Sequence, residues 1–193
     1  MTQSIDILGL HLSPRRGGTS RVVLDYFLKG AKNAGASTEV VSVSEFEPIQ
    51  GCLECGACNH KGECAVEDDM SKVYRAFEAT KKIVVSTSLF FYDVPAQGKA
   101  LIDRSQAFWA RRYVLGQHKN GRPGAKGFLI AVGATKGKDL FLPVTLSVRY
   151  FFDSLAYPKD FGTLFFRKLE SPSDLTAEQL QEVEAAGEAF VSG

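Results

Sequence analysis

Residues 5–20 read IDILGLHLSPRRGGTS, and this stretch decides the class of fold that the chain predicts. Its beginning, Ile5–Leu10, is short and mostly apolar, as a buried β-strand is. A Ser-Pro-Arg-Arg-Gly-Gly turn follows, and then Thr19–Ala34 repeats its apolar residues at helical spacing until Gly35 stops it. The stretch therefore predicts a strand, a loop and a helix in close succession.

The same alternation of short apolar runs and longer helical ones continues along the chain. Further strands are predicted at Thr38–Val43, Ile83–Thr87, Gly127–Val132 and Phe161–Phe166, and further helices at Asp69–Ala79, Ala96–Leu115, Leu140–Leu155 and Thr176–Val191. Strands separated by helices pair in parallel through right-handed crossovers. We expect an α/β fold with a doubly wound five-stranded parallel sheet, in the order 2-1-3-4-5, inside a three-layer α/β/α sandwich. Thr176 and Gln179 predict a capping box on the last helix.

The length and the net charge of the chain limit its number of domains and the partners that it can bind. The 193 residues suit a single domain spanning 1–193, and the formal net charge of +1 argues against nucleic acid or an anionic membrane as a partner. No apolar run is long enough to cross a bilayer, and Met1–Asp6 lacks the basic start and apolar stretch of a signal peptide. We expect a cytoplasmic protein whose thiols stay reduced.

The first loop has the composition of a phosphate-binding loop. In a sheet of this order, ligands bind beyond the carboxyl ends of the strands where the strand order reverses, which here means the loops after strands one and three. The loop offers hydroxyl groups, and its glycines let the backbone curl so that its N–H groups point inward. It lies just before the N-terminus of a helix, and the side chain of Arg15 or Arg16 can add a charge-assisted hydrogen bond to a phosphate. These residues are Ser13, Arg15, Gly17, Gly18, Thr19 and Ser20. The alternative is an ordinary polar turn in which Thr19 caps the helix.

The loop after strand three contains three adjacent aromatic residues. A flat ring with one polar edge needs apolar walls and a few backbone hydrogen bonds, and this loop can supply both. The expected contacts are Ser88, Leu89, Phe90, Phe91, Tyr92 and Asp93, with Gly133, Ala134 and Thr135 of the loop after strand four closing over the other side of the ring. The alternative is that the aromatic residues pack under the loop or at a dimer seam.

These loops resemble those of the flavodoxin-like superfamily of NAD(P)H-dependent FMN reductases. Ser13-Pro14-Arg15 matches its first loop, with Leu12 in the place of a Gly and Thr19 in the place of an Asn. Lys99 and Ile102-Asp103-Arg104 match the helix after its second loop, in which Thr87–Phe90 lacks the usual Pro and has Phe for Tyr. The resemblance covers essentially the whole chain. It implies a bound FMN that carries the chemistry, so that no side chain is required as a catalytic acid or base.

Four cysteines lie in a cysteine-rich loop at residues 51–65. Cys52, Cys55, Cys58 and Cys64 have the spacing C-x2-C-x2-C-x5-C. Compact runs of this kind suit an iron–sulfur cluster, whereas structural zinc more often uses two pairs held well apart. Zinc and unmetallated thiols remain alternatives, and His60 is either a substitute ligand or a solvated loop residue. His11 and His118 show no partner pattern.

The cysteine spacing and its continuation into Glu67–Met70 resemble the iron–sulfur flavoproteins, a branch of the same superfamily. The resemblance implies that the four cysteines ligate a 4Fe-4S cluster beside FMN. An exposed cluster is oxygen-labile, so an aerobic preparation can lose it. The leading hypothesis is FMN-dependent electron transfer with the cluster as one-electron partner. The alternatives are an NAD(P)H-dependent reductase of quinones, nitro compounds or flavin without a cluster, and a non-enzymatic flavodoxin-type carrier.

Partners are expected from the same resemblance. The electron donor or acceptor is a redox protein or NAD(P)H. Proteins of this type generally build the flavin site at a dimer interface, so a homodimer or homotetramer is expected. The helix Ala96–Leu115, with Phe108, Trp109 and Tyr113, is a candidate interface element, and ordinary core packing is the alternative.

Overall fold

The computed structural model describes residues 5–192, in which five parallel strands form one sheet in the order β2-β1-β3-β4-β5. The strands are β1 (Ile7–His11), β2 (Thr38–Ser42), β3 (Lys82–Ser88), β4 (Lys126–Gly133) and β5 (Gly162–Arg167). The predicted strands and their order are confirmed, with ends shifted by one or two residues. Of the N-terminal residues Met1–Asp6, only Ile5 and Asp6 lie within the described range.

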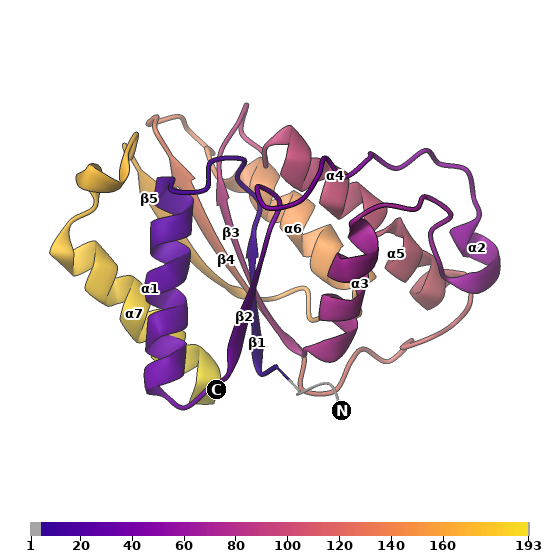
Figure 1. The fold of residues 1–193 in the computed structure, drawn as a ribbon. Coiled ribbons are helices and arrows are strands. Elements are labelled where there is room, and N and C mark those ends of the chain that lie inside the picture. The colour runs from indigo at the N-terminus through magenta and orange to yellow at the C-terminus, as the bar shows by residue number, and fades with distance from the viewer. Residues whose placement is uncertain (1–4, 193) are drawn as a thin grey trace.

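Helices cover both faces of the sheet. They are α1 (Thr19–Asn33), α2 (Cys58–Lys61), α3 (Met70–Ala79), α4 (Ala96–Arg104), α5 (Gln106–Tyr113), α6 (Leu142–Ser154) and α7 (Ala177–Ser192), with a short 3-10 turn at Pro172–Asp174. Figure 1 shows α1 and α7 on one face and α3, α4, α5 and α6 on the other. The three-layer sandwich is therefore confirmed. The predicted capping box of α7 is also present, with Gln179 N–H and Thr176 Oγ1 3.2 Å apart.

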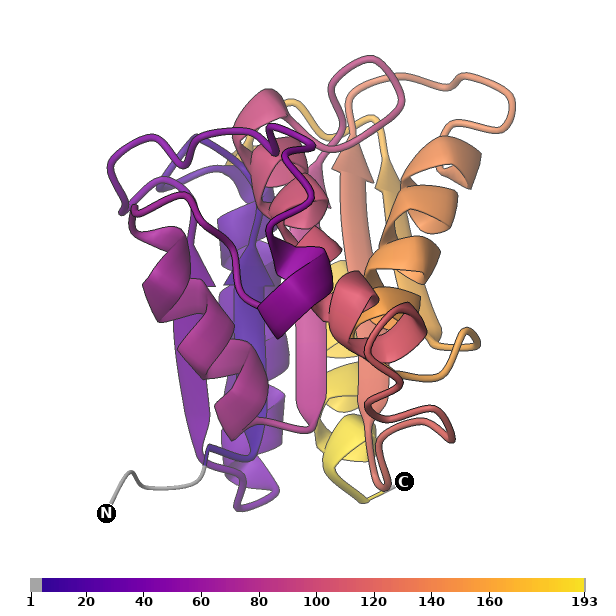
Figure 2. The ribbon, with the colours of Figure 1, turned by 90° about the vertical axis from the view of Figure 1, so that its right-hand side faces the viewer.

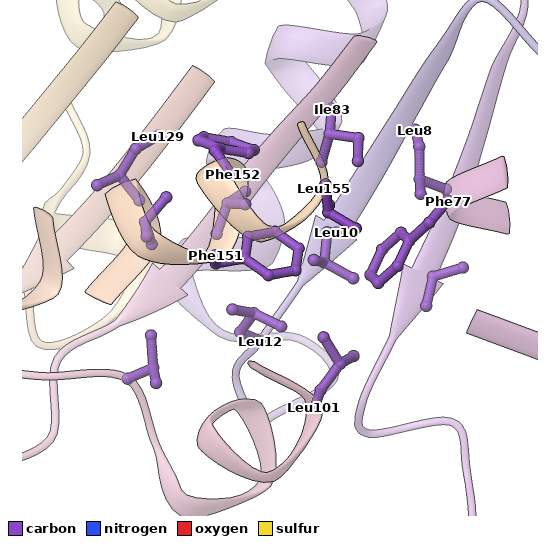
Figure 3. Close-up of a cluster of buried hydrophobic side chains, with 14 of the residues drawn as sticks. Leu8, Leu10, Leu12, Phe77, Ile83, Leu101, Leu129, Phe151, Phe152 and Leu155 are labelled. Carbon is purple, nitrogen blue, oxygen red and sulfur yellow. The ribbon is translucent and has the colours of Figure 1, made fainter. Parts of the chain in front are cut away.

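Each face of the sheet packs its own apolar core. On one side, alternate residues of β1 such as Leu8 and Leu10 lie against α3 and α6, and the rings of Phe77 and Phe151 meet edge-on with centroids 5.5 Å apart (Figure 3). Full burial of a side chain such as Phe151 contributes roughly 1.5–3 kcal/mol. The opposite residues of the central strands pack under α1 and α7. The sheet is thus a rigid base for the loops at its edge.

Helices α1 and α7 touch through their backbones. A Cβ atom placed on Gly30 of α1 would collide with the carbonyl group of Glu184, and one placed on Gly187 of α7 would collide with that of Phe27. Both glycines are therefore required by close approach of the two helices rather than by a special backbone angle.

The prediction of one continuous helix at Ala96–Leu115 is wrong in one respect. The segment forms two helices, α4 and α5, which are separated at Ser105. The Ser105 hydroxyl donates to the Leu101 carbonyl at 3.2 Å, a back-bond that bends helices. The Ser105 N–H also bonds both Leu101 and Ile102 carbonyls, which tightens the turn. The break lets α5 run beside the short helix α2, which no sequence pattern predicted.

The loops that follow the strands gather at one edge of the sheet. Figure 2 shows the segments after β1, β3 and β4 together at the top of the molecule, above the carboxyl ends of their strands. Within residues 5–192, no helix combines the length and the apolar character that crossing a membrane requires.

Candidate functional site

A cavity of about 420 Å³ opens where the loops after β1, β3 and β4 meet. Its volume falls within the range of small-molecule sites. Nine of the residues predicted to bind a cofactor line it: Ser13, Arg15, Gly18, Thr19, Ser20, Ser88, Leu89, Phe90 and Ala134. Four more, Pro14, Val132, Leu169 and Glu170, were not predicted. Leu169 and Glu170 follow β5, whose loop carried no motif.

The loops after β1 and β3 are joined by a hydrogen bond at the cavity wall. The Ser88 hydroxyl donates to Ser13 Oγ at 3.0 Å, and Ser13 is itself buried. Because Ser13 accepts this bond, its own hydroxyl hydrogen is available to a ligand. The two arginines of this loop have different positions. Arg15 lines the cavity, whereas Arg16 donates through Nε to the Ser44 carbonyl at 3.0 Å.

The N-terminus of α1 faces this region with Gly18 as its N-cap residue. Thr19 is the first helical residue and not the cap, and in the described part of the chain no side chain caps the helix. The first N–H groups of a helix have no partner inside it, and together with the helix dipole they attract anions. The alternative in which Thr19 merely caps the helix does not describe this structure.

Beneath the first turn of α1 lies a buried row of polar side chains. His11, Ser42 and Ser86 occupy the same register on β1, β2 and β3, and each is 0% exposed. His11 Nε2 lies 3.1 Å from Ser20 Oγ, and the Ser86 hydroxyl donates to the Ser20 carbonyl at 2.7 Å. Sequence reasoning missed His11 because its partners come from a distant strand and from the next helix.

Burial is the main reason that the pKa of His11 falls to about 4, and the positive charge of Arg21 lowers it further. Its other ring nitrogen, Nδ1, lies 2.9 Å from Ser42 Oγ. The imidazole is therefore neutral near pH 7 and uses both nitrogens in hydrogen bonds.

The aromatic loop after β3 folds into a tight turn. Phe90 and Asp93 exchange backbone hydrogen bonds of 2.8 and 3.1 Å, and Phe91 and Tyr92 between them have positive φ values of 50° and 72°. Positive φ at both central residues defines a type I′ turn, which Asn and Gly adopt more easily than aromatic residues. Phe91 is fully exposed at the tip.

Six of the predicted cofactor contacts do not line the cavity: Gly17, Phe91, Tyr92, Asp93, Gly133 and Thr135. Asp93 is committed elsewhere, since its carboxylate accepts from the Val94 N–H and from the Ser147 hydroxyl on α6, both at 2.8 Å. Of the aromatic run, only Phe90 lies at the cavity wall. The remaining contacts stay predictions about a bound state.

A second cavity, of about 760 Å³, lies between the cysteine loop and helices α4, α5 and α6. All four predicted ligands, Cys52, Cys55, Cys58 and Cys64, line it. Burial raises the pKa of the Cys58 thiol, and the charges of the other three cysteines raise it further. Trp109 of α5 and Tyr150 of α6 also line this cavity. The four cysteines thus line one cavity.

These thiols do not form a closed metal site. Within the part of the chain that the structure describes, no group of three or more His, Cys, Asp or Glu side chains is placed to hold a metal ion. The chemistry of the donor set, four free thiols on one cavity, fits an iron–sulfur cluster, but their positions are open. Cys52 and Cys55 are exposed.

Arg104 ties the two ends of the cysteine loop to helix α4. Its guanidinium donates to the Gln50 carbonyl at 2.9 Å before the first cysteine, and to the Val66 carbonyl at 3.1 Å after the last. It also pairs with Asp68, and although burial opposes the shift, the bond to Arg104 lowers the pKa of that carboxyl. Arg104 Nε is buried and finds no hydrogen-bond partner among residues 5–192.

Solved structures share the fold of this chain. The chain superposes on an NAD(P)H:quinone oxidoreductase from Methanothermobacter marburgensis with a TM-score of 0.68 and 17% identity, covering 97% of each chain. It superposes on an FMN-dependent NADH-azoreductase from Bacillus anthracis, solved with FMN, with a TM-score of 0.69 and 14% identity, covering 97% of this chain and 100% of that one. At such identities the likeness shows a flavodoxin-like α/β fold.

Sequence comparison then gives the family. Residues 5–139 match the model of the NADPH-dependent FMN reductases, so the chain belongs to this family of flavin-dependent oxidoreductases. It is 34% identical over 109 residues to an iron–sulfur flavoprotein of Methanosarcina thermophila, covering 56% of each chain. It is 33% identical over 143 residues to an iron–sulfur flavoprotein of Archaeoglobus fulgidus, covering 73% of this chain and 69% of that protein. It spans only about half of another relative from A. fulgidus, with 51% covered.

Proposed function

We propose that the protein is an FMN-dependent oxidoreductase that binds the FMN phosphate in the loop between β1 and α1. The observation that carries this proposal is the 420 Å³ cavity, in which the buried hydroxyls of Ser13, Thr19 and Ser20 lie at the free N-terminus of α1. Hydroxyl and amide donors around a helix N-terminus are the groups that a phosphate monoester requires. Arg15 adds a positive charge at the rim.

The isoalloxazine ring is assigned to the apolar part of the same cavity. Leu89, Phe90 and Leu169 line this cavity and provide apolar walls for a ring. The exposed Phe91 and Tyr92 turn stands beside this opening, and its unfavourable backbone angles are of the kind that persist at ligand-binding loops. FMN supplies the redox chemistry, accepting an electron pair as hydride and releasing electrons singly.

The four cysteines are assigned as ligands of a 4Fe-4S cluster in the 760 Å³ cavity. The assignment is supported by the position of all four cysteines in the lining of one cavity and by the bonds of Arg104 to both ends of the loop. A cluster transfers single electrons, which would couple the flavin to a one-electron partner such as a redox protein. Because Cys52 and Cys55 are exposed, we expect oxygen to destroy the cluster in air.

A second candidate function is favoured by the open arrangement of the thiols. In this alternative the protein is an NAD(P)H-dependent reductase of quinones, nitro compounds or flavin, and the cysteine loop holds no cluster. Free thiols in this number suit a reducing compartment such as the cytoplasm under either function.

Anaerobic purification followed by flavin, iron and sulfide analysis separates the two functions. We expect the visible spectrum of oxidised flavin together with the broad absorption of a cluster. Stoichiometric FMN without iron at any stage would exclude the cluster and leave the reductase, which steady-state oxidation of NADH or NADPH then tests. Colourless protein that takes up no FMN on titration would exclude both functions.

We also propose that the protein is a homo-oligomer. Several large apolar side chains on α5 and α6 are exposed to solvent: Trp109, Tyr113, Leu142, Leu146 and Tyr150. Large exposed apolar side chains on neighbouring helices are a feature of protein interfaces when they form one patch. Sedimentation velocity is expected to give a dimer or tetramer, and Trp109→Glu is expected to shift it toward the monomer.

A further inference from the structure

We propose that His11 is a positioning residue that orients the Ser20 hydroxyl hydrogen toward the flavin phosphate, which rests on the phosphate site proposed above. His11 lies at the end of β1, 3.1 Å from Ser20 Oγ through Nε2 and 2.9 Å from Ser42 Oγ through Nδ1. Ser20 is 1% exposed and nevertheless lines the cavity. The histidine therefore touches the phosphate-binding hydroxyl from behind.

The backbone of Ser20 is held by a separate hydrogen bond. What remains open is the direction in which the Ser20 hydroxyl group bonds. The Ser86 hydroxyl donates to the Ser20 carbonyl at 2.7 Å, and this bond has only one possible direction because a carbonyl can only accept. The hydroxyl of Ser20, in contrast, can either donate to His11 or accept from it. Which of these occurs depends on the ring tautomer.

The ring is neutral near pH 7, because burial lowers the pKa of His11 to about 4. A neutral imidazole has one N–H and one acceptor nitrogen. If Nε2 carries the hydrogen, it donates to Ser20 Oγ, and the Ser20 hydroxyl hydrogen is free to bond a phosphate oxygen. Nδ1 then accepts from the Ser42 hydroxyl, and Ser42 Oγ in turn accepts from the Ser44 hydroxyl 2.8 Å away. All four groups are satisfied in one direction.

The other tautomer, with the hydrogen on Nδ1, reverses the direction of this row of hydrogen bonds. Ser20 then donates to Nε2 and presents only lone pairs to the cavity, where a phosphate anion would be repelled. A bound phosphate and the Nε2–H tautomer therefore favour each other. A hydrogen bond to a charged group contributes about 1.5–3 kcal/mol, so loss of the correct orientation predicts roughly ten- to hundredfold weaker binding of FMN. Riboflavin has no phosphate, so its binding should not depend on the orientation of the Ser20 hydroxyl group.

The experiment compares a matched pair of variants. The amide of Gln reaches about as far as Nε2 of His and can donate to Ser20, whereas the amide of Asn reaches only as far as Nδ1. We expect His11→Asn to weaken FMN binding at least tenfold while the dissociation constant of riboflavin changes less than twofold. His11→Gln is expected to restore most of the preference for FMN. Fluorescence titration with FMN and with riboflavin measures both constants.

Nitrogen-15 NMR of the wild-type protein tests the tautomer directly and requires no substitution in the core. His60 and His118 are the other two histidines and both are exposed, so the spectra of His60→Ala and His118→Ala identify by elimination which signal belongs to His11. We expect the Nε2–H form in the FMN complex. An Nδ1–H form in the complex, or equal loss of FMN and riboflavin binding in His11→Asn, overturns the inference.

The outcomes also separate this inference from the proposed function. Wild-type protein that does not prefer FMN to riboflavin refutes the phosphate site itself, and the inference with it. Wild-type protein that prefers FMN, with the preference unchanged in His11→Asn, refutes only the role of His11.

Discussion

Arg104 and Asp68 form a two-bonded ion pair, with Nη1 2.8 Å from Oδ2 and Nη2 3.1 Å from Oδ1. Arg104 is 1% exposed, and the same guanidinium bonds the carbonyl groups of Gln50 and Val66. One side chain of helix α4 therefore holds both ends of the loop that presents the four cysteines. The geometry of that loop depends on Arg104 even before any metal binds.

We predict that Arg104→Lys destabilises the protein by about 2–4 kcal/mol. An ammonium group cannot reproduce the four hydrogen bonds that the planar guanidinium makes, and it leaves the partly buried carboxylate of Asp68 without its two-bonded partner. Denaturant unfolding measures the loss, and limited proteolysis is expected to cut faster within residues 51–65. Lys99→Ala on the same helix is the control. Its ion pair with Asp103 is exposed, so a change below about 1 kcal/mol is expected. Equal effects of the two variants would contradict the clamp.

We predict that Cys64→Ser lowers the iron and sulfide content of anaerobically purified protein and leaves its FMN content unchanged. A serine hydroxyl is a poor substitute for a thiolate, and Cys64 lines the cysteine cavity and not the flavin cavity. His60→Ala is the matched control in the same loop and should retain iron. Retained iron in Cys64→Ser together with its loss in His60→Ala would reassign the fourth ligand to His60.

We predict that Gly187→Ala destabilises the protein by about 1–3 kcal/mol, because the added methyl group forces α7 away from the backbone of α1. Thermal or denaturant unfolding provides the measurement. Gly51→Ala is the control, since a Cβ atom there meets no atom of the described residues within 4 Å. A neutral effect of Gly187→Ala would mean that the two helices are farther apart than the structure places them.

We predict that stability decreases as the pH is lowered from about 6.5 to about 4. The folded-state pKa of His11 is about 4 against an ordinary value of 6.5, so the unfolded chain binds more protons in this window. At about 1.36 kcal/mol per pKa unit the loss is roughly 3 kcal/mol. Arg21 and Asp25 of α1 are the charged groups that act on His11, with Arg21 lowering and Asp25 raising its pKa.

Denaturant unfolding at a series of pH values measures this dependence, and His11→Gln is expected to flatten it. The carboxyls of Asp6 and Asp68, whose pKa values are lowered, lose their contribution only below their ordinary value of 3.8. Their titration therefore lies outside the His11 window. An unchanged slope between pH 6.5 and 4 in His11→Gln would show that another group is responsible.

Much of this protein was determined by the sequence alone. The alternation of apolar strands and amphipathic helices predicted the sheet order 2-1-3-4-5, because parallel strands joined by right-handed crossovers allow few other arrangements. The loop residues Ser13, Thr19 and Ser20 were placed correctly at the carboxyl edge of the sheet by the same topology. The spacing of the four cysteines predicted ligands of one cluster, which stays a prediction, and the structure shows that all four line the same cavity.

Other features were decided only by the tertiary structure, because they depend on contacts between residues far apart in the chain. His11 shows no pattern of its own, and only the pairing of β1 with β2 and the return of α1 place it between Ser42 and Ser20. Arg104 matched a family motif, but its hold on the cysteine loop required the packing of α4 beside residues 50–68. Sequence periodicity reports which face of an element is buried, whereas hydrogen-bond partners across elements are set by how those faces meet.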